Sequence, residues 1–133
     1  MNEAGATLIA DEKDLWPDKK FCTVVLAAST SFLEKNPDRV RDFLAAHGEI
    51  TEWVNANRAS AAEIANAQLE ILVGKKLQKK VLESAFGRIE FTTDPIATSI
   101  REFARRSQEL GCVKTLPNLD ALFWKAPKTG GTP

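Results

Sequence analysis

The sequence has few of the side chains on which most catalytic and metal sites depend. Its 133 residues include one histidine, no tyrosine, one methionine and two cysteines. Cys22 and Cys112 lie far apart and form no CxxC pair, so neither zinc binding nor thioredoxin-like redox chemistry is indicated. We expect both cysteines to be buried free thiols, although the sequence leaves open whether they form a disulfide. No metal and no cofactor is predicted.

Charge of one sign and long apolar runs are also missing. The 18 Lys and Arg residues balance the 18 Asp and Glu residues, so the clustered positive charge that nucleic-acid binding needs is absent. The longest apolar run is Val24 to Ala28, whereas a membrane span needs about 20 apolar residues. The N-terminus lacks the basic stretch, apolar core and cleavage site of a secretory signal peptide. We therefore predict neither nucleic-acid binding nor membrane insertion.

The hydrophobic pattern predicts a helix-rich α/β fold with a few strands and about four main helices. Residues 21–28 (FCTVVLAA) are apolar and rich in β-branched side chains, which predicts a strand buried on both faces. Residues 88–92 (RIEFT) alternate between polar and apolar and predict a short strand or an extended crossing. Helices are indicated by helical spacing of apolar residues, by helix-starting Asn-Pro and Asp-Pro pairs and by helix-ending glycines. These signals predict helices over residues 31–35, 37–57, 60–73, 77–86 and 95–110, then a turn at 118–124. The expected domain is 1–125, and 126–133 is predicted to be a disordered tail.

The catalytic inventory does not indicate an enzyme. His47 falls on the apolar stripe of the predicted 37–57 helix, so a structural role is favoured over a hydrolase site. The turns at residues 28–31 and 92–94 place hydroxyls where a helix begins, an arrangement that suits either helix capping or a bound anion. Capping is the favoured interpretation, and Asp94 is expected to be the N-cap of the last helix.

From Leu15 to Asn57 the sequence resembles a known protein family. The phrase FLEKNPDRVRDFLAAHGEITEWVNAN resembles one in the ABC-transporter substrate-binding proteins of the nitrate, taurine and aliphatic-sulfonate group. Three later phrases, RIEFTTDP, FARRSQELGCV and LPNLDALF, resemble that family's last extended segment, last long helix and closing turn. The resemblance covers about Thr7 to Phe123, and the order and spacing of the phrases are more specific than any one of them.

The resemblance implies a type II-like periplasmic binding protein, a two-lobed α/β receptor that closes on a small solute and delivers it to a membrane permease without chemistry. The intact parent would be periplasmic or otherwise extracytoplasmic. Family members are more than twice as long, so the chain is expected to be a C-terminal part with a partial lobe. It would be a cut piece or the product of a truncated gene.

Five residues are candidates for the solute site because they lie where the resemblance has chain segments crossing between lobes: Phe21, Thr23, Phe91, Thr92 and Thr93. Hydroxyls beside an aromatic wall would suit a sulfonate, taurine or nitrate, while core packing and capping are the alternative roles. Solute binding is expected to be weak or absent in half a cleft. The exposed edge of the 21–28 strand predicts self-association. A helical protein-interaction module without solute binding is the alternative function. The sequence does not identify the solute or the oligomeric state.

Overall fold

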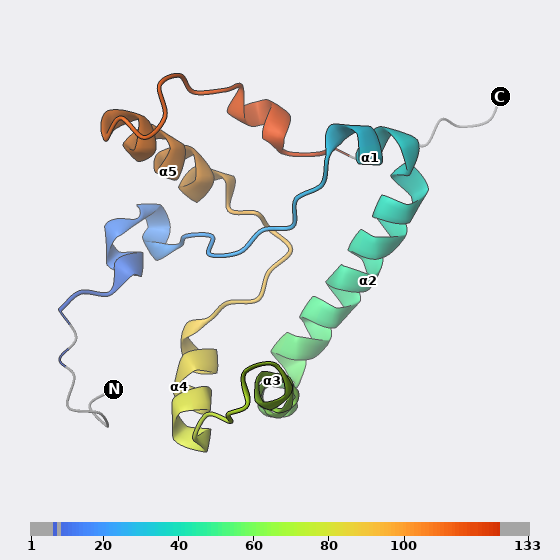
Figure 1. The fold of residues 1–133 in the computed structure, drawn as a ribbon, viewed down its shortest axis with the longest axis vertical. Coiled ribbons are helices and arrows are strands. Elements are labelled where there is room, and N and C mark those ends of the chain that lie inside the picture. The colour runs from blue at the N-terminus through green and yellow to red at the C-terminus, as the bar shows by residue number, and fades with distance from the viewer. Residues whose placement is uncertain (1–6, 8, 126–133) are drawn as a thin grey trace. The chain divides into compact units, whose positions relative to one another are not determined.

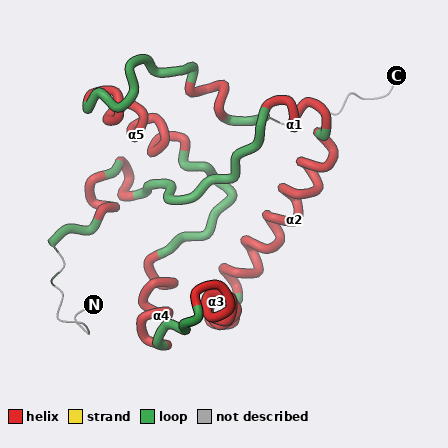
Figure 2. Tube along the Cα trace, viewed as in Figure 1, coloured by secondary structure: helices red, strands yellow, loops and turns green. Residues whose placement is uncertain are grey.

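A computed structural model describes residue 7 and residues 9–125, and every regular element among them is a helix (Figures 1 and 2). Five are α-helices and three are short 3₁₀ helices. In chain order they are η1 Glu12–Leu15, η2 Pro17–Lys19, α1 Thr30–Lys35, α2 Pro37–Ala56, α3 Arg58–Val73, α4 Lys79–Arg88, α5 Ala97–Glu109 and η3 Leu119–Leu122. The predicted α/β class is therefore wrong for the described residues, which contain no strand. The predicted tail 126–133 lies outside them.

Several helix boundaries follow from local sequence signals and confirm the predictions. Ser29 Oγ accepts a hydrogen bond from the Phe32 N–H at 3.3 Å and caps α1. Pro37 begins α2, where its missing N–H costs no intrahelical bond. Gly74 ends α3 with φ of 72°, a left-handed conformation that glycine adopts without a Cβ clash.

Other boundaries differ from the prediction. Helix α3 begins at Arg58 rather than Ser60. Helix α4 continues through Gly87, where it was predicted to end, as far as Arg88. Helix α5 begins at Ala97, and its N-cap is Ile96, which has φ of 50°. Asp94, which was predicted to be the N-cap, lies outside the helix and accepts a hydrogen bond from the Ile96 N–H at 2.8 Å, so α5 begins two residues later than predicted. The predicted caps Ser60, Gly87 and Asp94 are therefore not the observed caps of α3, α4 and α5, which are Asn57, Ile89 and Ile96.

The predicted buried strand at residues 21–28 is an extended segment without a ladder. It is also largely exposed, since the side chain of Val24 is 85% accessible and those of Val25 and Leu26 are more than half accessible. A strand is stabilised by a neighbouring strand, and no other described segment forms one. The apolar composition of the segment was read correctly, but its pairing and burial were not.

The described chain divides into two compact units, and the division falls between Asp42 and Phe43 within α2 and between Thr93 and Asp94. We call residues 43–93 the α3–α4 unit, to which residue 7 also belongs. We call residues 9–42 and 94–125 the α5 unit. Each is described by itself.

In the α3–α4 unit, helix α4 packs against α3 (Figure 1). The buried apolar residues are Ala61 and Ala62 on α3 and Leu82 on α4. Because alanine is small, the two helices approach closely, but such a core buries little apolar area. Asn66 joins the loop between them to α3, since its side chain accepts from the Leu77 N–H at 2.8 Å and donates to the Leu77 carbonyl at 3.0 Å.

In the α5 unit, side chains of α5 hold the segments on either side of it. The Arg101 guanidinium forms an ion pair with Asp120 at 2.6 Å and lies 5.5 Å from the centroid of the Phe123 ring. These contacts attach the predicted closing turn, observed as η3, to α5. Residues 15–22 are also attached to α5, through contacts of Trp16 and Cys22.

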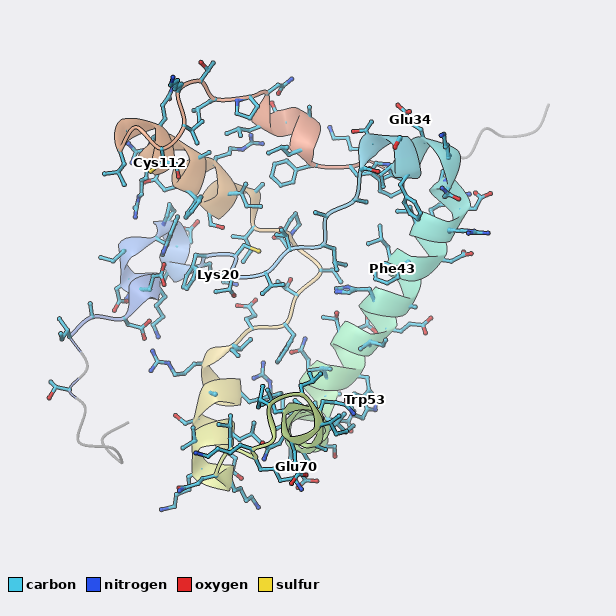
Figure 3. The ribbon with its side chains drawn as sticks, in the orientation of Figure 1. Lys20, Glu34, Phe43, Trp53, Glu70 and Cys112 are labelled. Carbon is cyan, nitrogen blue, oxygen red and sulfur yellow. The ribbon has the colours of Figure 1, made fainter. Side chains whose placement is uncertain are left out.

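The apolar stripe predicted for α2 is present on the helix but is not buried. None of the residues of α2 is buried, and Phe43 and Trp53 project from it with exposed fractions of 57% and 44% (Figure 3). Periodicity predicted which face is apolar and did not reveal whether something covers that face. Among the described helices, none is both long enough and apolar enough to cross a membrane.

Candidate functional site

The five sequence-predicted site residues are divided between the two units. Phe21 and Thr23 belong to the α5 unit, and Phe91, Thr92 and Thr93 belong to the α3–α4 unit. In both groups an aromatic ring is half-buried and the threonines are exposed. Each ring packs on side chains that the sequence analysis did not assign to a site.

Phe21 lies in an aromatic stack that we call the Trp16 cluster, made of Trp16, Phe21, Phe103 and Arg106. The Trp16 ring stacks on Phe21 with a centroid separation of 5.7 Å and on Phe103 with one of 6.2 Å. The Arg106 guanidinium carbon lies 4.7 Å from the Trp16 ring centroid, within the range of a cation–π interaction. Phe21 therefore packs on Trp16 while it remains half-buried.

A charged network on α5 fixes the position of Arg106. The Arg106 Nη2 donates to the Leu15 carbonyl at 2.7 Å, and its Nε donates to Glu102 at 2.7 Å. Glu102 also accepts from Arg105 Nε at 2.8 Å. Hydrogen bonds from Arg105 and then Arg106 lower the pKa of Glu102 to about 2, and the same carboxylate raises the pKa of Arg105. At spacings of three and four residues, these side chains lie on one face of the helix.

Ser99 joins the segment that carries Thr23 to the first turn of α5. Its hydroxyl accepts from the Cys22 N–H at 3.0 Å and donates to the Ile96 carbonyl at 2.9 Å. Ser99 is only 2% exposed, and its hydroxyl makes both bonds in that buried position. Sequence reasoning missed it, although its spacing of three and four residues from Ile96 and Phe103 placed it on the apolar stripe of the predicted helix.

Phe91 packs in a second cluster, in the α3–α4 unit. Its ring lies 5.6 Å from that of Phe86 and 5.7 Å from the Arg58 guanidinium carbon. The Phe91 carbonyl accepts from Asn55 Nδ2 at 2.8 Å. The Asn55 side chain thus bonds a backbone carbonyl that a neighbouring strand would otherwise bond. Of the predicted strand or crossing at residues 88–92, Arg88 belongs to α4 and residues 89–92 form no strand. Thr92 and Thr93 follow it with exposed side chains.

The histidine and the cysteines form no recognised reactive group. His47 is half-buried on α2, with its ring 6.4 Å from that of Phe43. Both thiols are free, with Cys22 half-buried and Cys112 exposed, so the expectation that both are buried is wrong. Within residues 7 and 9–125, no three His, Cys, Asp or Glu side chains gather in a way that could hold a metal ion.

Comparison with protein families places the chain among the substrate-binding components of ABC transporters. The chain belongs to the NMT1-like family, whose model matches residues 1–69, just over half of its 133 residues. This is a nitrate-, sulfonate- and taurine-type family of solute-binding proteins, non-enzymatic in general and typically extracytoplasmic, that works with an ABC permease. Searches of curated proteins and of solved structures returned no match.

Proposed function

We propose that the chain contributes to the binding of a small anion, an aliphatic sulfonate, taurine or nitrate, in a receptor that supplies an ABC permease. The observation that supports this is the repeated pairing of exposed threonine hydroxyls with a half-buried phenylalanine, Thr23 beside Phe21 and Thr92 and Thr93 beside Phe91. Hydroxyls donate to the oxygens of an oxyanion, and an aromatic ring offers apolar contact to a short organic tail. Hydrogen bonds to a charged group contribute about 1.5–3 kcal/mol each.

The chain acts, in this proposal, as the C-terminal part of a larger receptor that is periplasmic or otherwise extracytoplasmic. Its support is the exposed apolar surface, since Val24 to Leu26 and the Phe43 and Trp53 face of α2 are accessible in the described chain. Residues of this kind are usually covered in a folded receptor. A site that covers only part of a solute binds it weakly, because a pocket normally buries most of its ligand.

Nuclear magnetic resonance titration of the chain with taurine, methanesulfonate and nitrate tests the proposal, because it detects weak binding and locates it. We expect dissociation constants of about 1 mM or weaker, and chemical-shift changes concentrated on the amides of residues 21–23 and 91–93. Sodium chloride at equal ionic strength is the control for general electrostatic effects.

A Thr93→Val variant removes one hydroxyl and keeps the side-chain shape. The shift changes near residue 93 should then weaken for all three anions. Shift changes spread over the Lys-rich residues 75–80, or none at all, would overturn the assignment of the site. Micromolar affinity would contradict the expectation that the chain covers only part of the solute.

Self-association is a second candidate, supported by the exposure of the extended apolar segment from Val24 to Leu26. We propose that a second copy covers this segment, since extended apolar chain pairs readily with another strand. Size-exclusion chromatography with light scattering should show a dimer, and Val25→Lys should shift it toward monomer. A stable monomer at micromolar concentration refutes this candidate and leaves the anion proposal unchanged. A helical interaction module would be favoured instead if changes on α2, such as Phe43→Ser, removed the association.

A further inference from the structure

We propose that Arg58, together with Asn55, is a positioning residue for the segment that carries Phe91, Thr92 and Thr93. This inference rests on the proposed function, because those three residues form part of the candidate solute site. Arg58 and Asn55 lie within a turn of each other where α2 ends and α3 begins. Neither was singled out by the sequence analysis.

Three backbone carbonyls are held by these two side chains. Arg58 Nη1 donates to the Phe86 carbonyl at 2.5 Å, and Nη2 donates to the Ile89 carbonyl at 3.0 Å. Asn55 Nδ2 donates to the Phe91 carbonyl at 2.8 Å. In extended chain, carbonyls two residues apart point the same way, as those of Ile89 and Phe91 would toward a neighbouring strand. Arg58 and Asn55 therefore donate to carbonyls that the N–H groups of a neighbouring strand would otherwise bond, in the segment that leads to Thr92.

The location of Arg58 in its own helix supports a role beyond that helix. It is the first residue of α3, where the helix dipole disfavours a positive charge. Its guanidinium donates instead to a carbonyl in the last turn of α4, the negative end of that helix, where a cation is favoured. The unfavourable position of the Arg58 charge at the start of α3 is thus offset by its favourable position at the end of α4, next to the candidate site.

The planar guanidinium suits this task better than an ammonium group. Its fork presents separate N–H donors to the Phe86 and Ile89 carbonyls, and its central carbon lies 5.7 Å from the centroid of the Phe91 ring. Lysine keeps the charge but donates from a single nitrogen, so it cannot reproduce the two directed bonds and the ring contact together. Arg58→Lys therefore separates geometry from charge.

Amide hydrogen exchange of the full chain, read residue by residue, tests the inference. In Arg58→Ala and in Arg58→Lys we expect the amides of residues 90–93 to exchange at least about tenfold faster, because directed hydrogen bonds from a charged group are lost. Exchange within α3, from Ile64 to Leu72, should remain unchanged. Arg39→Lys, on the exposed side of α2, is the matched control and should change neither region.

Three results would overturn the inference. These are unchanged exchange at residues 90–93, full rescue by lysine, or uniform acceleration of α3 and α4 in both Arg58 variants, which would indicate a purely structural role. Titration with taurine separates this inference from the proposed function. If the wild-type chain shows no shift changes at residues 91–93 while the exchange result holds, the solute site is refuted and the positioning of the segment stands.

Discussion

Replacing Trp16 by leucine should destabilise the α5 unit, because one ring contacts three side chains. Trp16 stacks on Phe21 and Phe103 at 5.7 and 6.2 Å, and the Arg106 guanidinium carbon lies 4.7 Å from its centroid. Leucine keeps apolar volume but has no flat ring face. At about 0.5–1.5 kcal/mol for each aromatic pair and about 0.5–1 kcal/mol for the cation–π contact, the expected loss is about 1.5–4 kcal/mol.

The measurement is urea unfolding followed by far-ultraviolet circular dichroism, since the loss of a tryptophan would itself change the fluorescence signal. Trp53→Leu is the control, because Trp53 lies on α2 and is 44% exposed. We expect that control to change the free energy of unfolding by no more than about 0.5 kcal/mol. The m-value should be the same in all variants if only the native contacts change.

A double-mutant cycle with Arg106→Gln isolates the cation–π contribution. The coupling between the two positions should be about 0.5–1 kcal/mol at this partly exposed site. If Trp16→Leu costs no more than Trp53→Leu, the Trp16 cluster does not stabilise the unit. A coupling of zero with a large Trp16→Leu effect would leave the stacking intact and refute only the role of Arg106.

Four further substitutions test other parts of the structure. Hydrogen bonds from Arg105 and Arg106 lower the pKa of Glu102 from 4.5 to about 2, so the contribution of the Glu102 carboxylate to folding stability is complete above pH 4.5 and is lost as the pH falls to about 2. Glu102→Gln should remove that part of the acid dependence of unfolding, and an unchanged pH profile would contradict this prediction. Gly48→Ala, where an added Cβ meets nothing within 4 Å inside α2, should stabilise by about 0.8–1 kcal/mol, whereas Gly74→Ala at φ of 72° should destabilise by about 1–2 kcal/mol; shifts of the same sign in denaturant midpoint would refute the backbone argument. Ser99→Ala should cost about 1–3 kcal/mol and speed exchange of the Cys22 amide, because it leaves that N–H without its acceptor, while exposed Ser60→Ala should change little.

The helices were largely predictable because their signals are local. Ser29, Pro37 and Gly74 act through their own backbone geometry within one turn, so the sequence is sufficient to place α1, the start of α2 and the end of α3. The start of α5 was misplaced because Ile96 adopts φ of 50°, which is rare for a β-branched residue and has no sequence signature.

The strands could not be predicted correctly because pairing is not a local property. Residues 21–28 have the composition of a buried strand, but burial depends on what lies on either side. In the described chain the Cys22 N–H is bonded by a serine hydroxyl, and the Phe91 carbonyl is bonded by an asparagine amide. Each interaction joins residues far apart in sequence, and a single sequence does not reveal such partners.

The residues of the candidate site also differ in how far the sequence alone could identify them. Phe21 and Phe91 were proposed because the family resemblance places chain segments that cross between lobes at these positions. Ser99 was missed because it lies within a helical pattern that already explains its presence, and Arg58 was missed because it falls between the predicted helices 37–57 and 60–73. Their contacts with the two extended segments become apparent only when the chain is folded. Residues that contact these segments from a distant part of the sequence are therefore harder to infer than residues within the segments.

The exposed segment from Val24 to Leu26 gives the self-association proposal its energetic scale. Full burial of a valine or leucine side chain contributes about 1.5–3 kcal/mol. The three residues are 85%, 51% and 57% accessible, so about half or more of that gain remains available at each position. The sum is several kcal/mol, comparable with the lower end of the stability of a whole domain, about 5 kcal/mol. If a second copy covers the segment as proposed, Val25→Lys should reduce this gain and shift the equilibrium toward monomer.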